Sequence, residues 1–361
     1  MDYNTLDKNL QLHTTIAMPI GQSQVTVFDV FDSIKDNLYG SDKEKNYVFL
    51  TFTDTNTIEM MNSGTNKIVI PEREQILNLT QIIGDEVIRK NKLYFYNPIV
   101  TMTFKNPLTA LLNFNISSVY ATNGTDVVYA NFNGTPTTTI PLIPSPQNGQ
   151  FGDTEFTFDR TNGGTHLLFR LQEPKELGIK YSVEVAPNED ISDEVFPQTA
   201  TLITTVKLPF HFDAKSELRS IDTIRDVNLD LATQEGGIEF EELNLELKFH
   251  NHLPVQTNAT IRFIDMLGNE ICRKENISVD SPEVDANGFA QEPFITDILI
   301  KFNSSETKEI KNTKNIIIEY AITGKTEDSQ INIKGTDWVK LFISAYIKGT
   351  VNQNIDDIIN K

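Results

Sequence analysis

The chain has little of what usually holds a small protein together or carries covalent chemistry. Cys272 is the single cysteine among 361 residues, which excludes an internal disulfide framework and a cysteine-rich metal site. A nucleophilic cysteine would need a histidine partner, and none lies near Cys272 in the sequence. We therefore expect Cys272 to be a small, half-buried side chain in a strand.

Positive charge is also scarce, because 31 Lys and Arg stand against 50 Asp and Glu, a net charge of −19. A nucleic-acid partner is not expected, since binding phosphates requires a basic patch. No run approaches the roughly 18 apolar residues of a membrane span, so no transmembrane segment is expected. The acidity favours cationic partners or neutral ones such as glycans.

Motifs of known reaction centres are missing as well. No Gly-x-Ser-x-Gly, Gly-rich phosphate loop or His-Glu-x-x-His is present. His250 and His252 would share one strand face, as two metal ligands do, but Lys248 lies beside them and no third ligand is near. Carboxylates are abundant, yet a solvated acidic surface explains them without a glycosidase pair. We expect no enzyme, catalytic residue, metal or cofactor, and the ligand-binding residues remain unassigned.

Period-two alternation of apolar and polar residues recurs along the chain. Residues 243–250 place leucine and phenylalanine on one side and polar residues on the other, which predicts a strand with one buried face. Residues 339–347 alternate in the same way, but Trp338, Phe342 and Tyr346 lie on their second side. For this last strand we predict that both faces are covered.

These strands, with Asn-Gly turns between them, predict a mainly β protein of tandem antiparallel β-sandwich-like domains. One or two short helices are expected. We divide the chain into an N-terminal β segment with a short helix (1–90), a β-sandwich (91–195) and a C-terminal β domain (196–361). Alternatively, residues 1–90 pack with 196–361 and the middle sandwich is inserted between them.

Helical spacing is visible in two places. Val27, Phe31, Ile34 and Leu38 fall on one face of a helix that would pack against the core. Residues 71–87 suit either a helix or a strand.

Two sequence echoes suggest internal duplication. Asn106-Pro107-Leu108 and Asn251-His252-Leu253 are each followed by a strand and then by an Asn/Gly turn at the same distance. Thr14-Thr15 before Pro19 resembles Thr204-Thr205 before Pro209 in the same way.

Short motifs spread over most of the chain resemble a group of surface or periplasmic lipoproteins of gut Bacteroidetes. The resemblance rests on residues 16–21, 25–31, 47–53, 96–98, 106–108, 251–268 and 336–340. Such proteins have β-sandwich or elongated β domains, some similar to the lipid-carrying bactericidal/permeability-increasing fold. The resemblance thus implies an alternative fold, an elongated α+β domain of that type.

This resemblance implies an exported protein of the cell envelope, in the periplasm or on the outer-membrane surface. The lipidated cysteine of the family is not found near Met1, so we expect the export signal, with any lipid anchor, to precede the numbered chain. The favoured function is non-enzymatic binding or adhesion to a glycan or protein. The alternative is a carrier of lipid or another hydrophobic ligand, with an apolar tunnel between the Val339–Ile347 strand and the Val27–Leu38 helix.

Overall fold

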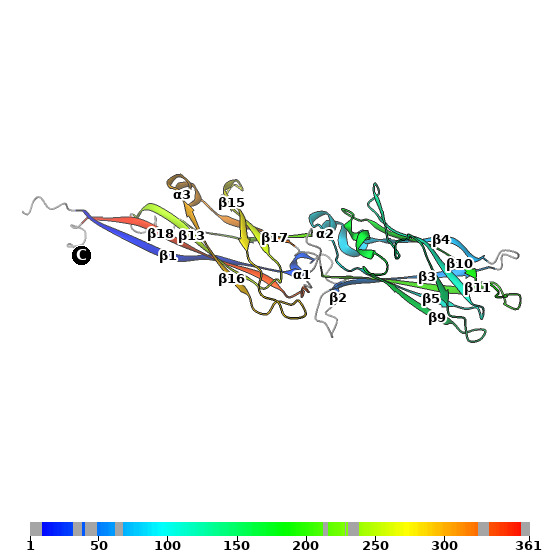
Figure 1. Ribbon diagram of the computed structural model, residues 1–361. Helices are drawn as coiled ribbons and strands as arrows, with labels where there is room; N and C mark the ends of the chain where they lie inside the picture. Colours follow the sequence, from blue (N-terminus) through cyan, green and yellow to red (C-terminus); the bar gives the residue numbers. More distant parts are fainter. Residues whose placement is uncertain are drawn as a thin grey trace, which may run out of the picture. The chain divides into compact units, whose positions relative to one another are not determined.

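The computed structural model describes residues 9–31, 38–39, 49–61, 68–211, 216–227, 229, 238–323 and 332–354. Their strands form four antiparallel sheets in two compact units (Figure 1). Unit 1 comprises Met1–Val30, Leu218–Thr323 and Thr336–Lys361, and unit 2 comprises Phe31–Glu217 and Gly324–Gly335. The chain is mainly β with sandwich-like units, as predicted, and the alternative α+β fold is not the one found.

Unit 1 consists of two four-stranded sheets. The first has the order β1 (Asn9–Thr26), β18 (Trp338–Asn354), β13 (Ile238–Asn251) and β16 (Phe294–Phe302). The second has the order β12 (Glu217–Ile224), β17 (Asn315–Thr323), β14 (Thr257–Ile264) and β15 (Glu270–Val279). The described part of this unit also contains the helices α1 (Val27–Val30) and α3 (Ser304–Ile310).

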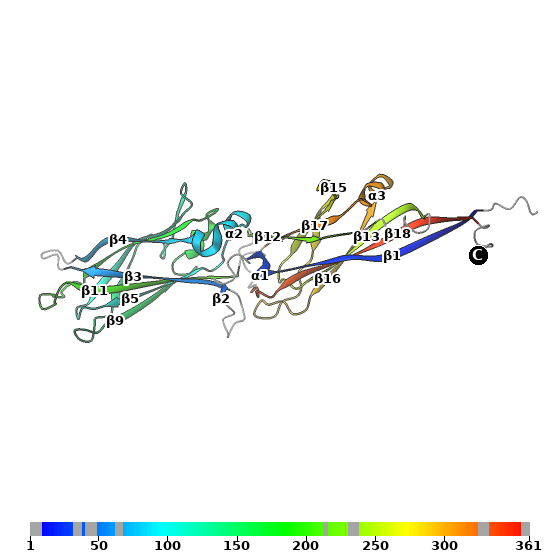
Figure 2. The same cartoon turned by 180° about the vertical axis from the view of Figure 1, so that it is seen from behind.

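Unit 2 consists of two five-stranded sheets (Figure 2). The first has the order β2 (Leu38–Tyr39), β3 (Phe49–Met60), β11 (Gln198–Pro209), β5 (Ile99–Asn106) and β9 (Gly152–Phe158). The second has the order β4 (Ile68–Asn78), β10 (Glu176–Val185), β6 (Leu112–Thr122) and β7 (Val127–Tyr129), with β8 (Thr138–Leu142) also paired to β6. Its helical turns are η3 (Thr80–Gly84), α2 (Asp85–Lys90) and η4 (Thr165–Arg170).

The two units share one strand order. In unit 2 the chain runs through β3, β4, β5, β6, β8, β9, β10 and β11, and in unit 1 through β1 and then β12 to β18. The sheet order β3-β11-β5-β9 of unit 2 corresponds to β1-β18-β13-β16 of unit 1, and β4-β10-β6-β8 corresponds to β12-β17-β14-β15. The short strands β2 and β7 are additions to unit 2. Unit 2 is therefore a second copy of this sandwich, inserted between the first and second strands of unit 1.

A buried asparagine marks the same corner in both copies, where the chain crosses from one sheet to the other. Asn251 ends β13, and its side-chain amide donates hydrogen bonds to the carbonyls of Val255 and Asp280 at 3.0 and 2.9 Å. Its Oδ1 accepts from the Leu253 N–H at 2.9 Å. The side chain therefore satisfies three backbone groups that leave the regular ladder at this corner.

Asn106 repeats this arrangement at the end of β5. It donates to the carbonyls of Ala110 and Ile143 at 3.3 and 3.2 Å and accepts from the Leu108 N–H at 2.9 Å. The offsets of two and four residues are those of Asn251, and both asparagines are fully buried. The first sequence echo thus lies at equivalent positions of the duplicated sandwich. The second does not, because Thr14 to Pro19 lie in β1 whereas Thr204 to Pro209 lie in β11, and the counterpart of β1 is β3.

The expected boundaries at residues 90 and 195 do not coincide with the two units. β3 and β4 lie within 1–90, but they pair with β11 and β10 of unit 2. Met1–Val30 alone joins the C-terminal strands, through the pairing of β1 with β18. The alternative, in which 1–90 pack with 196–361 around an inserted sandwich, has an insertion as the structure does, but the inserted unit begins at Phe31 and ends at Glu217. Partners this distant in the chain leave no local sequence signal that would fix these bounds.

The helix expected from Val27 to Leu38 is a single turn, because α1 ends at Val30 and Leu38 lies in β2. Ile34 lies outside the described residues. Valine and phenylalanine are weak helix formers, which is consistent with the early end of α1. The ambiguous stretch 71–87 forms both predicted structures, the end of β4 followed by η3 and α2.

We expect replacement of either corner asparagine by alanine to destabilise its unit by about 2–3 kcal/mol, because buried backbone groups lose their partners. Trp338 is the single tryptophan and belongs to unit 1, so its fluorescence during urea unfolding measures the effect of Asn251→Ala. For Asn106→Ala, circular dichroism during urea unfolding measures the loss of stability. The exposed Asn312→Ala is the control, and unfolding midpoints equal to that control would contradict the role given to these side chains.

Candidate functional site

The outer face of the β1-β18-β13-β16 sheet gathers most of the polar and aromatic residues that the sequence singled out. Along β18, Val339, Leu341, Ile343, Ala345 and Ile347 are buried in the core. Trp338, Phe342 and Tyr346 alternate with them and are half-buried on the outer side. The second face of this strand is therefore only partly covered among the described residues, because its rings are half-buried while the inner side chains are fully buried.

His250 near the end of β13 and His252 directly after that strand lie beside these rings. His250 pairs with Lys340, and the His252 N–H donates to the Trp338 carbonyl at 2.8 Å. The His252 ring stacks on Trp338 at 5.8 Å with an interplanar angle of 12°, and the His250 ring meets Phe342 edge to face at 5.3 Å. We call Trp338, Phe342, Tyr346, His250 and His252 the aromatic face.

Hydrogen bonds and ion pairs hold the polar groups around these rings. The Tyr346 hydroxyl donates to Glu246 Oε2 at 2.9 Å, which raises the pKa of that tyrosine. The Lys340 ammonium lies 4.8 Å from the centre of the Phe342 ring, a cation–π distance. On the neighbouring strand, Lys248 pairs with Asp297 at 3.7 Å.

Glu242, Glu246 and Asp297 on this face each have a hydroxyl, amide or ammonium partner. Glu242 accepts from Asn244 at 2.9 Å and from Lys348 at 3.1 Å, and both partners lower the pKa of its carboxyl. The face therefore differs from the strongly acidic chain as a whole. At the edge strand β16, Ile295 and Leu299 add apolar side chains that are 50% and 54% exposed.

His252 and Asp337 form the one pair on this face that resembles part of a catalytic arrangement. His252 Nδ1 lies 3.2 Å from Asp337 Oδ1, and Asp337 is buried. Such a pair orients a general base, but a base also needs a nucleophile within hydrogen-bond reach. In the described structure the His252 side chain contacts Trp338 and Asp337, and neither of these carries a hydroxyl or thiol that a base could activate.

The two histidines share a face, as their spacing predicted, but they contact different rings. Within the described ranges, no group of three or more His, Cys, Asp or Glu residues could hold a metal ion. What the arrangement offers is a mixed platform of flat rings and oriented hydrogen-bonding groups. Sequence reasoning placed Trp338, Phe342 and Tyr346 on one side of their strand but missed that β13 is its neighbour.

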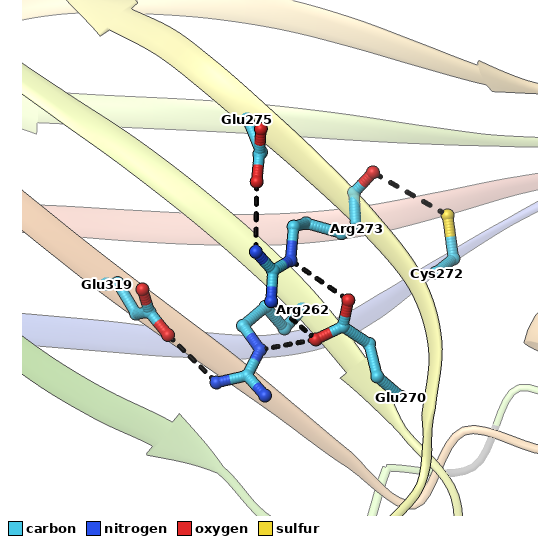
Figure 3. A network of polar contacts seen from close by, with 6 residues as sticks. All are labelled: Arg262, Glu270, Cys272, Arg273, Glu275 and Glu319. Atoms are coloured by element: carbon cyan, nitrogen blue, oxygen red, sulfur yellow. Dashed lines mark hydrogen bonds and ion pairs between the residues drawn. The ribbon is translucent and has the colours of Figure 1, made fainter.

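A second polar cluster lies on β14, β15 and β17, with Cys272 to one side of it next to Arg273 (Figure 3). Glu270 accepts from Arg273 Nε at 2.9 Å and from Arg262 Nε at 2.6 Å, and Arg262 also donates to Glu319 at 2.9 Å. These hydrogen bonds lower the pKa of Glu270. The cluster joins three neighbouring strands and has the form of a structural ion-pair lattice.

Cys272 itself is half-buried, as expected. Burial raises the pKa of its thiol, and its Sγ lies 4.0 Å from the carbonyl oxygen of Arg273. A raised pKa keeps the sulfur protonated near neutral pH, which disfavours nucleophilic chemistry.

No protein-family model and no curated protein matches this chain. Among solved structures, the chain is similar to one described as a putative secreted protein from Parabacteroides distasonis. That similarity has a TM-score of 0.63 at 12% identity and covers 92% of this chain and 99% of the other, so the two share a fold.

Two further matches have TM-scores too low to indicate a common fold. PNGase F, a glycosylasparaginase from Flavobacterium meningosepticum, gives 0.21 at 11% identity, over 83% of this chain and 97% of that one. A structure of infectious bursal disease virus gives 0.20 at 12% identity, over 98% of this chain and 84% of that one. Among the described residues, no helix is long and apolar enough to span a membrane.

We expect Cys272 to react slowly with iodoacetamide at neutral pH because few molecules carry the thiolate. The rate should still be rising at pH 9.0, the ordinary pKa for this group, since the pKa of the buried thiol is higher. Mass spectrometry of the alkylated protein at a series of pH values measures the alkylation rate, with free cysteine as the reference compound. A rate that reaches its plateau below pH 8 would rule the raised pKa out.

We expect Glu270→Gln to lower the unfolding midpoint at pH 7. The pKa of Glu270 is lower in the folded chain than its ordinary value of 4.5, so the carboxylate stabilises the fold above that pH. This stabilisation is lost as the pH falls through the folded pKa, and the difference from wild type should then disappear. Thermal unfolding from neutral to acid pH tests this, with the exposed Glu292→Gln as control. A difference that does not change with pH would contradict the linkage.

Proposed function

We propose that this chain is a non-enzymatic, exported protein of the cell envelope that binds a neutral glycan on the aromatic face. The observation that carries the proposal is the row of Trp338, Phe342 and Tyr346 on the outer side of β18, with His250 and His252 beside it. Three properties of this face support a glycan, namely its rings, its balanced charge and its rigid support.

The rings suit a sugar because a pyranose has an apolar C–H face that packs on a flat aromatic surface. Phe342 and Trp338 lie four residues apart along β18, which corresponds to about 14 Å at ~3.4 Å per residue. A chain of several sugars could therefore contact both rings. Aromatic side chains also bring a large contact area with few rotatable bonds, which keeps the entropy cost of binding low.

The polar groups suit a neutral ligand. Glu246, Glu242 and Asp297 are each engaged by a hydroxyl, amide or ammonium group, so the face offers hydrogen bonds without a large net charge. Sugar hydroxyls both donate and accept, and side chains already held in place can meet them at little further cost. An anionic glycan would have to approach a chain of net charge −19.

The core behind the face supplies rigidity. Leu243, Leu245, Leu247 and Phe249 fill the inner side of β13, next to the buried residues of β18. Binding residues carried by such a packed sheet keep their spacing in the free protein. The alternative of a lipid carrier required a tunnel between the Val339–Ile347 strand and a Val27–Leu38 helix. That helix ends after the single turn α1, so one wall of the expected tunnel is not formed as predicted.

Export and an envelope location belong to the same proposal. They rest on the motifs shared with envelope lipoproteins of gut Bacteroidetes and on the fold shared with the Parabacteroides protein that is described as secreted. The aromatic face would then bind glycans at the cell surface or in the periplasm.

A glycan array followed by calorimetry with the best neutral oligosaccharide tests the proposal. We expect Phe342→Ala and His250→Ala each to weaken binding by about tenfold, or ~1.4 kcal/mol, through lost ring contact. Tyr129→Ala is the matched control, because that aromatic residue is 53% exposed on unit 2. Circular dichroism should show that each variant is folded.

Failure of every neutral glycan to bind would overturn the proposal, as would equal losses for Tyr129→Ala and Phe342→Ala. Release of new reducing ends during the measurement would instead show an enzyme and would contradict the non-enzymatic assignment.

A further inference from the structure

One end of unit 2 presents an apolar surface that the proposed glycan site does not use. Four exposed side chains from three loops lie there: Leu111 (37% exposed), Ile143 (54%), Phe151 (49%) and Val195 (67%). We call these four residues the tip patch. Their loops connect β5 to β6, β8 to β9 and β10 to β11, at the end of the unit where β4, β10 and β11 are labelled in Figure 1.

Strand pairing brings these loops together. Asn106 at the end of β5 pairs with Gly152 at the start of β9, and Leu112 at the start of β6 pairs with both Leu142 and Val185. All three loops therefore leave the sandwich at the same end. Gly152 packs so closely on the carbonyl of Ile143 that a Cβ there would clash, which holds Phe151 and Ile143 near each other.

Hydrogen bonds between the loops fix this surface before any partner arrives. The Thr109 N–H and hydroxyl both donate to Glu194 Oε1 at 2.6 Å, which ties the first loop to the residue before Val195. The Ala186 N–H donates to the Leu111 carbonyl at 3.0 Å, and the Ser145 N–H donates to the Leu108 carbonyl at 2.8 Å. A preorganised surface loses less entropy on binding than a mobile one.

The charged residues within the three loops of the tip patch are all acidic. Residues 186–197 contain Glu189, Asp190, Asp193 and Glu194 and no lysine or arginine. Residues 107–111 and 143–152, which carry the other three apolar side chains, contain no charged residue at all. The three loops together thus have four carboxylates and no cation, a net charge of −4.

We propose that the tip patch is a docking surface for a cationic polypeptide segment whose lysine or arginine side chains flank apolar ones. The apolar centre would be buried against the partner, and the carboxylates of residues 189–194 would form a polar rim for its basic groups. Anionic lipid and nucleic acid would be repelled by the same rim. This surface shares no residue with the aromatic face, so each proposal stands or fails alone.

Fluorescence anisotropy with the full chain and three labelled synthetic peptides tests this proposal. The first peptide alternates lysine with leucine, the second replaces its leucines by serine, and the third replaces its lysines by glutamate. We expect the first to bind more tightly than either of the others, and its affinity should fall as salt is added, since the rim attraction is screened.

Matched double variants locate the binding. Phe151→Ser with Val195→Ser should weaken the first peptide by about tenfold, because both side chains lie in the tip patch. Val127→Ser with Tyr129→Ser removes a similar pair, exposed at the opposite end of β6, and should leave the affinity unchanged. Glu189→Gln with Asp193→Asn should weaken binding at low salt more than at high salt.

Three results would overturn the proposal: equal binding of the glutamate peptide, equal losses for the two serine double variants, or no binding of the lysine–leucine peptide. Binding of the lysine–serine peptide as tightly as the first would also overturn it, because the apolar side chains would then contribute nothing.

Discussion

Each sandwich depends on one constraint, the burial of a single face of every sheet. In β13 and β18, leucine, isoleucine and phenylalanine turn inward and leave alternate positions for the outer side. Because the inner faces account for the apolar contacts between the sheets, side chains on the outer face can vary without loss of the core. The aromatic face uses this freedom, since Trp338 and Phe342 lie outside a core that is already filled by Val339 and Leu341.

Duplication gives the chain two copies of this scaffold with different outer surfaces. The buried asparagine corner is kept in both, because Asn106 and Asn251 satisfy the same three kinds of backbone group. The surfaces have diverged around it. Unit 1 carries rings and histidines on a sheet, and unit 2 carries an apolar, acidic loop cluster at its end. One fold thus supports two chemically distinct candidate sites, which is why function has to be argued from sites.

Much of the local structure could be predicted from the sequence, and little of the strand pairing. Alternation in residues 243–250 and 339–347 indicated strands, and the motif at Asn106 and Asn251 indicated a repeat. Local signals do not show that β1 pairs with β18 or that His252 stacks on Trp338, since those contacts join residues far apart in the chain. The tip patch was missed for the same reason, because Leu111, Phe151 and Val195 come from separate loops. The helix predicted from Val27 to Leu38 was wrong in length, because the prediction relied on the spacing of four apolar residues and ignored their weak helix propensity.

The insertion of unit 2 has a consequence for how the protein is made. β1 precedes all the strands of unit 2 in the chain, whereas its sheet partner β18 follows all of them. During synthesis β1 therefore has to remain without its strand partner until β18 is made, while the inserted sandwich already has all its strands from β2 to β11. An unpaired strand can pair with strands of other chains, so we expect the folding of unit 1 to be the step most sensitive to aggregation.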